Sequence, residues 1–406
     1  MPSFKYLIMG GGMVAGYAAK AFVESGIKPG ELGIISADNA LPYERPPLSK
    51  GFLAGRETEK DILIAAPEFY ETHGIEVRLN TVVERLNPSQ KTVRTSSGEE
   101  YRFENLLIAT GARVRKLDVP GADLAGIHYL RSLADSRRIR EESERASRAV
   151  VIGGGFIAME VASVLAQRGL ETTMVMIEDR IWKRLFTPGM SDYFRRYYEA
   201  RGVRFETNAP VTAFSGNGRV QSVSLGNGKH APADLVVAGI GVVPETGVFE
   251  NTGLKIENGI VVNEYLETGI PGIYAAGDVA NYRDVLFGGY RRVEHWDNAV
   301  KQGQHAARVM TGSREPFENV PYFFSDDFDL SWEFWGDTAP ADRAVVRGDF
   351  ETNSFSVWWL ERGRLVAAFV MNRPDEEREL APEWIRARRE IAAEALADAS
   401  RPLRDS

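Results

Sequence analysis

Short apolar runs and helix-like segments alternate along the first two thirds of the chain. Residues 4–9, FKYLIM, are apolar and partly β-branched, which predicts a buried strand. The glycines that follow, and then the small residues of MVAGYAAKAF, predict a tight turn and a closely packed helix. A second strand is expected in ELGIIS, residues 31–36. Strands that alternate with helices predict the α/β class with a parallel sheet.

The same succession of strand, glycine turn and helix occurs a second time. Residues 148–169, RAVVIGGGFIAMEVASVLAQRG, repeat it, and ETTMVMI, residues 171–177, predicts the next strand. A single copy could be an ordinary packing turn between a strand and a helix. Two copies so far apart suit two separate domains better than short solenoid repeats.

The last third of the chain has a different pattern. Residues 293–312 predict a helix that ends near Gly312. Residues 355–370, FSVWWLERGRLVAAFV, predict a strand–turn–strand unit around Gly363. The tail, residues 385–406, predicts a charged helix whose basic stretch is a solvated face. A third domain of the α+β class is therefore expected at the C-terminus.

Composition narrows the possible functions. The 406 residues carry a net charge of −8, which disfavours a nucleic-acid binder, since such a protein needs a concentrated basic face. The chain has no cysteine, which excludes dithiol exchange and thiolate-bound iron–sulfur or zinc sites. The five histidines show no metal-ligand spacing, so no metal is expected. We predict no signal peptide, no membrane span and a cytoplasmic location.

Both glycine turns fit the motif G-x-G-x-x-A. In the first, Gly10 permits the tight turn and Gly12 lets the backbone approach a pyrophosphate, which the helix N-terminus attracts. Asp38, after the second strand, is a candidate acceptor for ribose hydroxyls. In the second copy, Gly153 and Gly155 take these roles. The corresponding acid is Glu178, which lies after the next strand.

A stiff segment separates the first helix from the rest of its domain. LPYERPPLSK, residues 41–50, holds three prolines, each of which fixes its own φ and extends the residue before it. Pro47 is expected in the first turn of a helix that Ser49 and Lys50 enter. A lysine there would face the positive end of the helix dipole, which is unfavourable for a cation. Lys50 is therefore either a functional group or a solvated turn residue.

These motifs together resemble the flavoproteins with two dinucleotide-binding domains. Three further segments add to the resemblance: PGIYAAGDVA at 271–280, LLIATGAR at 106–113 and GIGVVPE at 239–245. The resemblance implies a glutathione-reductase-like fold with two Rossmann-type domains. It implies an FAD domain at 1–113 and 241–315, an NAD(P)H domain at 114–240 and a C-terminal α+β interface domain at 316–406. Since cysteine is absent, electrons would pass directly from flavin to an acceptor.

LPYERPPLSKG resembles the segment of oxygenase-coupled ferredoxin reductases, apoptosis-inducing factor and monodehydroascorbate reductases that lies against the flavin. The resemblance implies that Lys50 and Glu160 form the catalytic pair, with the lysine near flavin N5. A fixed cation there favours reduced flavin. The implied FAD contacts are Gly10, Gly11, Gly12, Asp38, Arg45, Lys50, Val83, Thr110, Arg131, Asp278 and Trp296. The implied contacts with NAD(P)H and the flavin face are Gly153, Gly155, Ile157, Glu178, Arg184, Gly241, Glu294, His295 and Phe324.

Three acceptor hypotheses follow from the resemblance. Residues 320–337, VPYFFSDDFDLSWEFWGD, resemble plant-type monodehydroascorbate reductases, which implies a small organic radical as acceptor. A family arginine that binds the radical falls at Val300, however, and a family tyrosine falls at Phe324. The alternatives are a reductase for a [2Fe–2S] ferredoxin, with Arg291 and Arg292 as candidate docking groups, and a slow NADH-binding redox sensor. Each of the three acceptor hypotheses is compatible with a monomer or a homodimer.

Replacement of Glu178 by alanine is expected to narrow the ratio of kcat/KM between NADH and NADPH. Its carboxylate can accept both ribose hydroxyls of NADH and would repel the 2′-phosphate of NADPH. Arg180, Lys183 and Arg184 follow closely and could offset that repulsion, so we expect NADH to be preferred with some use of NADPH. Steady-state kinetics with both cofactors measure the ratio. An unchanged ratio would mean that Glu178 does not set the preference.

Overall fold

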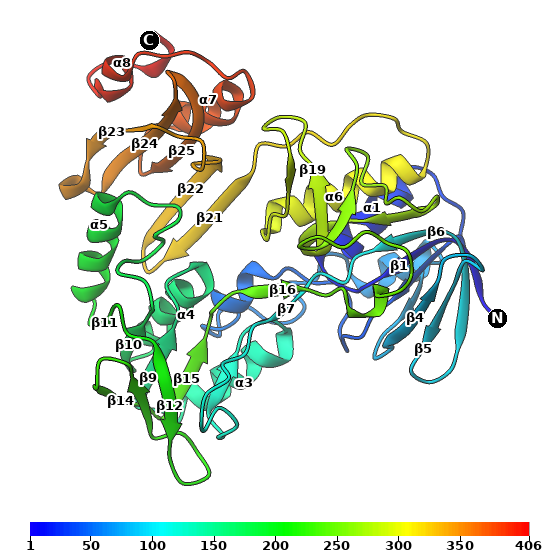
Figure 1. Ribbon diagram of the computed structural model, residues 1–406, viewed down its shortest axis with the longest axis horizontal. Helices are drawn as coiled ribbons and strands as arrows, with labels where there is room; N and C mark the ends of the chain where they lie inside the picture. The colour runs from blue at the N-terminus through cyan, green and yellow to red at the C-terminus, as the bar shows by residue number, and fades with distance from the viewer. Residues whose placement is uncertain (406) are drawn as a thin grey trace. The chain divides into compact units, whose positions relative to one another are not determined.

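The computed structural model describes residues 1–405, which form two compact units (Figure 1). The first unit consists of Met1–Arg45, Thr58–Arg113 and Val242–Asn319. The second consists of Pro46–Glu57, Val114–Gly241 and the chain from Val320 onward. The segment that contains Lys50 thus belongs with the second unit. The division into three domains stays a prediction.

One seven-stranded sheet forms the centre of the first unit, in the order β3-β2-β1-β6-β5-β4, with β18 also paired to β6. Its strands are β1 (Ser3–Met9), β2 (Leu32–Ile35), β3 (Glu76–Arg78), β4 (Val83–Asn87), β5 (Thr92–Thr95), β6 (Glu100–Ile108) and β18 (Ile273–Ala275). The pairs that involve β1, β2, β3 and β18 are parallel, whereas β4, β5 and β6 pair antiparallel. The predicted strands at 4–9 and 31–36 are the central strands of this sheet.

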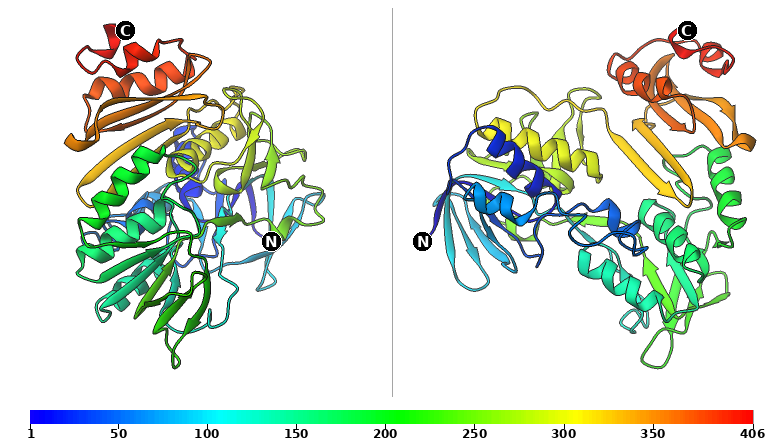
Figure 2. Two further views of the ribbon diagram at one scale, coloured as in Figure 1. Left: turned by 60° about the vertical axis from the view of Figure 1, so that its left-hand side comes forward. Right: turned by 180° about the vertical axis from the view of Figure 1, so that it is seen from behind.

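Two helices of the first unit pack closely against each other. They are α1 (Met13–Glu24) and α6 (Trp296–Met310), and they lie side by side in the turned views of Figure 2. Gly303 permits the close approach, since a Cβ there would lie 2.7 Å from the carbonyl oxygen of Val14. The other elements of this unit are α2 (Pro67–Thr72), η2 (Gly247–Phe249), β17 (Ile260–Val262), η3 (Gly277–Val279), β19 (Ala280–Arg283) and β20 (Tyr290–Arg291). A short ribbon, β7 (Ala112–Val114) with β16 (Val242–Pro244), lies where the chain leaves and re-enters the unit.

A parallel five-stranded sheet, in the order β11-β10-β9-β15-β8, forms the first half of the second unit. Its strands are β8 (Ile127–Tyr129), β9 (Arg148–Ile152), β10 (Glu171–Val175), β11 (Arg204–Glu206) and β15 (Leu235–Ala238). The helices are α3 (Leu133–Ser143), α4 (Phe156–Gln167) and α5 (Pro188–Glu199), and a small antiparallel sheet holds β12 (Val211–Ser215), β13 (Ser222–Leu225) and β14 (His230–Pro232). This sheet carries the second glycine turn, as predicted.

An antiparallel sheet in the order β21-β22-β25-β24-β23 forms the other half of the second unit. Its strands are β21 (Tyr322–Asp327), β22 (Leu330–Gly336), β23 (Arg343–Asp349), β24 (Ser354–Glu361) and β25 (Arg364–Met371). The strand–turn–strand expected around Gly363 is confirmed as β24 and β25, and the helix α7 (Asp375–Arg386) covers this sheet (Figure 2). The short helices are η1 (Pro46–Ser49), η4 (Phe350–Thr352), α8 (Ala393–Ala397) and η5 (Leu403–Asp405).

Aromatic side chains join the two halves of the second unit. The ring centroid of Trp332, on β22, lies 5.4 Å from that of Trp182 and 5.3 Å from that of Phe186, which precede α5. Phe186 also lies 5.4 Å from Phe369 on β25. Edge-on rings at these distances attract one another, and this attraction adds to the stabilisation from the apolar area that they bury. The aromatic cluster therefore fixes the antiparallel sheet against α4 and α5.

The prediction of one helix over residues 385–406 is wrong. The helix α7 ends at Arg386, and the chain then turns at Arg388, whose φ is +47°. Beyond this turn the backbone of residues 389–391 bonds to the start of β25, where that strand extends past the end of its neighbour β22: the amide of Leu365 donates to Arg389 and that of Ile391 donates to Gly363. An unpaired strand edge offers hydrogen bonds that a charged helical pattern in the sequence does not reveal.

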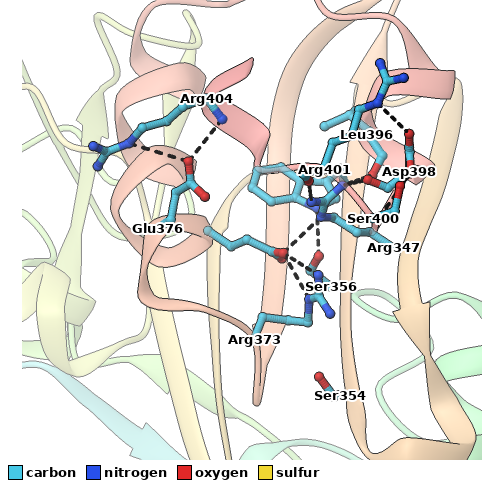
Figure 3. Close-up of polar contacts among 12 residues, drawn as sticks. Arg347, Ser354, Ser356, Arg373, Glu376, Leu396, Asp398, Ser400, Arg401 and Arg404 are labelled. Carbon is cyan, nitrogen blue, oxygen red and sulfur yellow. Dashed lines mark hydrogen bonds and ion pairs between the residues drawn. The ribbon is translucent and has the colours of Figure 1, made fainter. Parts of the chain in front are cut away.

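A buried arginine holds the C-terminal segment in place (Figure 3). Arg347, on β23, is 3% exposed, and its Nε lies 2.9 Å from the buried carboxylate of Glu377 on α7. Its remaining nitrogens donate to backbone carbonyls of the tail, at Leu396, Asp398 and Arg401. A guanidinium has five donors in a fixed plane, which suits several acceptors at once. The tail is therefore part of the folded unit.

Replacement of Arg347 by methionine is expected to lower the free energy of unfolding of the second unit by about 3 kcal/mol, because one buried charge loses a partner and three carbonyls lose their donor. Arg364→Met is the matched control. Arg364 lies on β25 of the same sheet, and both side chains of its ion pair with Glu390 are more than half exposed, so the loss of this pair should cost below about 1 kcal/mol. Urea unfolding measures both variants. Equal losses would contradict a structural role for Arg347.

Candidate functional site

The first glycine turn joins β1 to α1. Gly10 has a φ of +122°, and a Cβ there would lie 2.1 Å from the carbonyl oxygen of Ala109, so another residue would be strained and would collide with the backbone. Gly12 is the N-cap residue of α1 and supplies no side-chain hydrogen bond to the helix. The first amides of α1 thus keep their capacity to bind an anion. This geometry fits a pyrophosphate.

Two further predicted FAD contacts lie beside this turn. The guanidinium of Arg45 is 3.6 Å from the position that a Cβ of Gly12 would take. The side chain of Gly11, if it had one, would meet Ser36 at the end of β2. Asp38 follows β2, and its carboxylate accepts hydrogen bonds from the Tyr43 hydroxyl at 2.9 Å and the Asn39 amide at 2.8 Å. The structure therefore gathers these residues at the carboxyl end of β1 and β2.

Glu44 is a site residue that the sequence analysis missed. Its carboxylate accepts hydrogen bonds from the Tyr17 hydroxyl of α1 and from the Trp296 indole of α6, the latter at 2.6 Å. It thereby ties the proline-rich segment to both helices and orients Trp296. The available signal was its place in PYERPP, where a stiff backbone holds one carboxylate next to Arg45, which the resemblance assigns to the flavin.

The turn at Gly277 and Asp278 meets α6. The Gly277 amide donates to Gln302 Oε1 at 2.7 Å, and the carbonyl of Asp278 accepts from Arg292 at 3.2 Å. Within residues 1–405, Gln302 Nε2 and Asn298 Oδ1 are buried and have no hydrogen-bond partner. Buried polar atoms are normally paired. The amide donor of Gln302, next to the Gly277 turn, and the amide acceptor of Asn298 on the same helix fit a polar cofactor such as FAD.

The remaining predicted residues of the first unit are spread over several elements. Thr110 donates from Oγ1 to the carbonyl of Glu245 at 2.9 Å, between the two crossing segments. Glu294 pairs with Arg292 at 2.5 Å. His295 is the N-cap of α6, and its ring nitrogen accepts from the Asp297 amide. Val83 is buried at the first residue of β4.

The second glycine turn joins β9 to α4 and repeats the geometry of the first. Gly153 has a φ of +124°, and a Cβ there would lie 2.3 Å from the carbonyl oxygen of Gly239. Gly155 is the N-cap of α4, again without a side-chain bond, and a Cβ on it would meet nothing within 4 Å. Ile157, in the first turn of α4, is 40% exposed. The helix N-terminus is thus open to an anionic ligand.

Glu178 lies at the carboxyl end of β10, as the motif requires. Two of the three cations expected to offset its charge have another partner, since Lys183 lies 3.0 Å from Asp179 and Arg180 lies 3.8 Å from it. Arg184 is exposed two residues before Phe186. The pairing with Asp179 strengthens the expectation that NADH is preferred over NADPH.

Gly241 and Arg131 are the remaining predicted residues of the second unit. Gly241 has a φ of +94°, and the Arg115 side chain lies 3.8 Å from the position that its Cβ would take. Arg131 precedes α3, where its backbone amide donates to Asp135 at 3.1 Å beside the Ser132 cap. Their cofactor contacts stay predictions.

The structure brings Lys50 to Glu160. The ammonium lies 2.5 Å from Glu160 Oε1, and the Glu160 side chain is 4% exposed. Two serines also donate hydrogen bonds to the Glu160 carboxylate: Ser325 Oγ donates to Oε1 at 2.6 Å, and Ser49 Oγ donates to Oε2. Lys50 also lies 5.3 Å from the ring centroid of Phe324. A lysine held by a buried carboxylate and an aromatic ring is not a solvated turn residue.

The prediction that Lys50 enters a helix is wrong. The prolines start a single 3-10 turn, η1, which ends at Ser49, and the amide of Lys50 donates to the carbonyl of Pro47. Lys50 therefore follows a helical turn rather than opening one. Two adjacent prolines can begin such a turn but supply no amide to extend it. The unfavourable alignment of a cation with a helix N-terminus does not arise.

Ser49, Ser325 and Asp327 are further residues that the sequence analysis missed. Ser325 and Asp327 are two residues apart in YFFSDD, so both point to one face of β21. Both are fully buried. Two polar residues on the buried face of an aromatic strand were the signal, since such groups need polar partners. The Asp327 carboxylate accepts hydrogen bonds from Tyr198 and Trp332.

Comparison with protein families gives two matches. Residues 4–303 match the family described as pyridine nucleotide-disulphide oxidoreductase, and residues 322–406 match the family described as reductase C-terminal. Together they span both units. The first match covers both glycine turns and the Lys50–Glu160 pair.

Named relatives and solved structures give matches of similar length. Monodehydroascorbate reductase 4, peroxisomal, of Arabidopsis thaliana is 40% identical over 93% of this chain and 81% of its own length. The monodehydroascorbate reductase of Solanum lycopersicum is 36% identical over 92% of both chains. The ferredoxin reductase for the CYP199A2 system of Rhodopseudomonas palustris superimposes with a TM-score of 0.95 at 32% identity, over 100% of this chain and 99% of its own. Putidaredoxin reductase, in its covalent complex with putidaredoxin, superimposes with a TM-score of 0.94 at 31% identity, over 98% and 97%. These matches confirm the predicted fold class.

Within residues 1–405, every helix is too short or too polar to cross a bilayer.

Alanine at the two glycines of the second turn should have different effects. Gly153→Ala combines a positive φ with a backbone collision, so we expect a loss of about 1–3 kcal/mol in the stability of the second unit. Gly155→Ala should lose at most about 1 kcal/mol, yet weaken NADH binding, because a methyl group would stand where a pyrophosphate approaches. Urea unfolding and NADH titration separate the two effects. Unchanged NADH affinity in Gly155→Ala would argue against this turn as the pyrophosphate site.

Proposed function

The chain belongs to the pyridine nucleotide-disulphide oxidoreductase family, and from this premise we propose that it passes electrons from NADH through FAD to the monodehydroascorbate radical. It is an oxidoreductase whose cofactors are FAD and NAD(P)H. The observation that carries the choice of acceptor is that relatives named monodehydroascorbate reductase match more than nine tenths of the chain. Transfer directly from the flavin also agrees with the absence of cysteine.

The two glycine turns account for the binding of both cofactors. The turn at Gly10–Gly12, with Asp38 and Arg45 beside it, would hold the FAD pyrophosphate and ribose. The turn at Gly153–Gly155, with Glu178, would hold NADH. FAD, when bound, accepts a hydride from NADH and can release its electrons one at a time.

The protein contributes positioning and charge. The buried Glu160 carboxylate keeps the ammonium of Lys50 charged and fixes its direction. A fixed cation of this kind favours an electron-rich cofactor beside it. Glu44 fixes the indole of Trp296 in the same way, since its carboxylate accepts the indole N–H. Side chains that are already oriented before the cofactors meet reduce the cost of alignment.

A ferredoxin is the second candidate acceptor. The ferredoxin reductase of Rhodopseudomonas palustris and putidaredoxin reductase superimpose over nearly the whole chain, and the second of these was solved bound to putidaredoxin. Val300, on α6, stands where the resembling family has a radical-binding arginine, which also favours this alternative. Of the predicted docking groups, Arg291 pairs with Asp284 and Arg292 with Glu294, so each positive charge is already balanced.

The slow redox sensor, the cytoplasmic location and the choice between monomer and homodimer stay predictions. A sensor would turn over slowly with every acceptor and would retain NAD⁺ tightly after reduction. Transient kinetics with NADH alone identify this behaviour, because the flavin would be reduced without rapid reoxidation.

NADH oxidation should accelerate strongly when monodehydroascorbate radical is generated in the cuvette with the FAD-loaded protein. The rate should change little with ionic strength, since the acceptor is small. A [2Fe–2S] ferredoxin in place of the radical gives the comparison, because docking through charges weakens as salt is added. Rapid reduction of the flavin without turnover on the radical, together with salt-dependent turnover on ferredoxin, would overturn the proposal in favour of the second acceptor.

A further inference from the structure

A second buried carboxylate lies close to the Lys50–Glu160 pair. Asp327 ends β21, and none of its surface is exposed. Ser325, two residues earlier on the same face of the strand, donates to Glu160 at 2.6 Å. The strand β21 therefore contacts Glu160 through one polar residue and carries a second acid on the same buried face. The proposed function assigns no role to this acid.

The hydrogen bonds around Asp327 are best satisfied by the neutral acid. Trp332 Nε1 donates to Oδ2 at 3.0 Å, and the Tyr198 oxygen lies 2.7 Å from Oδ1. The same Tyr198 oxygen lies 3.2 Å from the carbonyl oxygen of Met159, the residue before Glu160. An ionised Asp327 would compete with Met159 for one hydroxyl proton. A neutral Asp327 donates a hydrogen bond to the Tyr198 oxygen, and the Tyr198 hydroxyl is then free to donate to the carbonyl of Met159.

The charged and hydrogen-bonding groups around Asp327 come from several other segments of the second unit. Burial raises its pKa from 3.8 to about 7, and the negative charge of Glu160 on α4 acts in the same direction. The bonds from Tyr198 on α5 and from Trp332, together with the positive charge of Lys50, oppose that rise. At the turn that follows β21, Asp329 is already engaged by Tyr197 and Arg201.

We propose that Asp327 is a positioning residue for the Lys50–Glu160 pair, which holds a proton in the resting protein and releases it to solvent as the pH rises through neutrality. While Asp327 is neutral, one carboxylate balances the charge of Lys50. Once it has ionised, two carboxylates face one lysine, and the local charge becomes negative. Its protonation is a property of the folded chain alone. Its effect on electron transfer follows from the proposed function, because a negative surrounding disfavours reduced flavin.

The protonation of Asp327 is measured without reference to activity, by urea unfolding of the holoenzyme and of Asp327→Asn across a pH series. Tryptophan fluorescence follows the second unit, which holds every tryptophan except Trp296. The folded state of the wild type binds the extra proton between the unfolded pKa of 3.8 and the folded pKa of about 7. The stability of the wild type relative to the variant therefore falls as pH rises through this window and levels off above it.

The expected size is a fall of about tenfold per pH unit in the folding equilibrium constant of the wild type relative to Asp327→Asn, up to about pH 7. A difference that is independent of pH would overturn the proposal, because Asp327 would then be ionised throughout. If the asparagine variant does not fold, Tyr198→Phe serves instead. That variant keeps the acid but removes the hydroxyl that donates to the ionised carboxylate and so lowers its pKa, and the infrared band of a protonated carboxyl should therefore persist to higher pH than in the wild type. Absence of the band from both proteins would overturn the proposal.

The link to Lys50 is tested by the rate constant of flavin reduction by NADH, measured by stopped flow over the same pH range. We expect it to fall several-fold through about pH 7 in the wild type and to lose this dependence in Asp327→Asn. Asp329→Asn, which removes an exposed carboxylate two residues away, should keep the wild-type profile. Retention of the pH dependence in Asp327→Asn would overturn the positioning role. No flavin reduction in any variant would contradict the proposed function, whereas the unfolding series would still decide the protonation of Asp327.

Discussion

The carboxylate of Glu160 is the group on which the arrangement of the second unit depends. A buried carboxylate is costly unless it is paired and fully hydrogen-bonded. Here it takes one ammonium and two hydroxyls from chain segments that are far apart in sequence. It thereby fixes the end of the proline-rich segment, the first turns of α4 and the middle of β21 at one place. Removal of Lys50 would leave a charge without a partner in the interior, and removal of either serine would take one hydrogen bond from the carboxylate.

The position of Glu160 on α4 adds a second consequence. The same helix begins at Gly155, where its open amides suit a phosphate. A helix of this length behaves as a rigid element. The group that would bind a dinucleotide and the group that orients Lys50 therefore move together. The aromatic cluster around Trp332 holds this helix and the antiparallel sheet as one body, so the orientation of Lys50 also depends on the packing of the C-terminal sheet.

Sequence patterns were sufficient for the parts of the molecule that are decided locally. The turns at Gly10 and Gly153 could be predicted because only glycine tolerates the backbone conformation there. The predicted strands are those with continuous apolar runs. The pairing of Lys50 with Glu160 came from resemblance, since no periodicity reveals a contact across so many residues. Ser49, Ser325 and Asp327 were missed for the same reason: their partners lie on other elements. The prediction for the tail was wrong because the first residues of β25, which extend past β22, and the guanidinium of Arg347 determine its path.

The pairing of β18 with β6 has a consequence for the order in which the protein can fold during synthesis. The ribosome finishes β6 at Ile108, but its partner begins only at Ile273. At the usual rate of translation this interval lasts on the order of ten seconds. Throughout it, the apolar end of β6, residues 106–108, has one unpaired edge, while residues 114–241 of the second unit are being made. A nascent chain of this design is exposed to edge-to-edge association, and its protection in the cell depends on chaperones or on rapid completion.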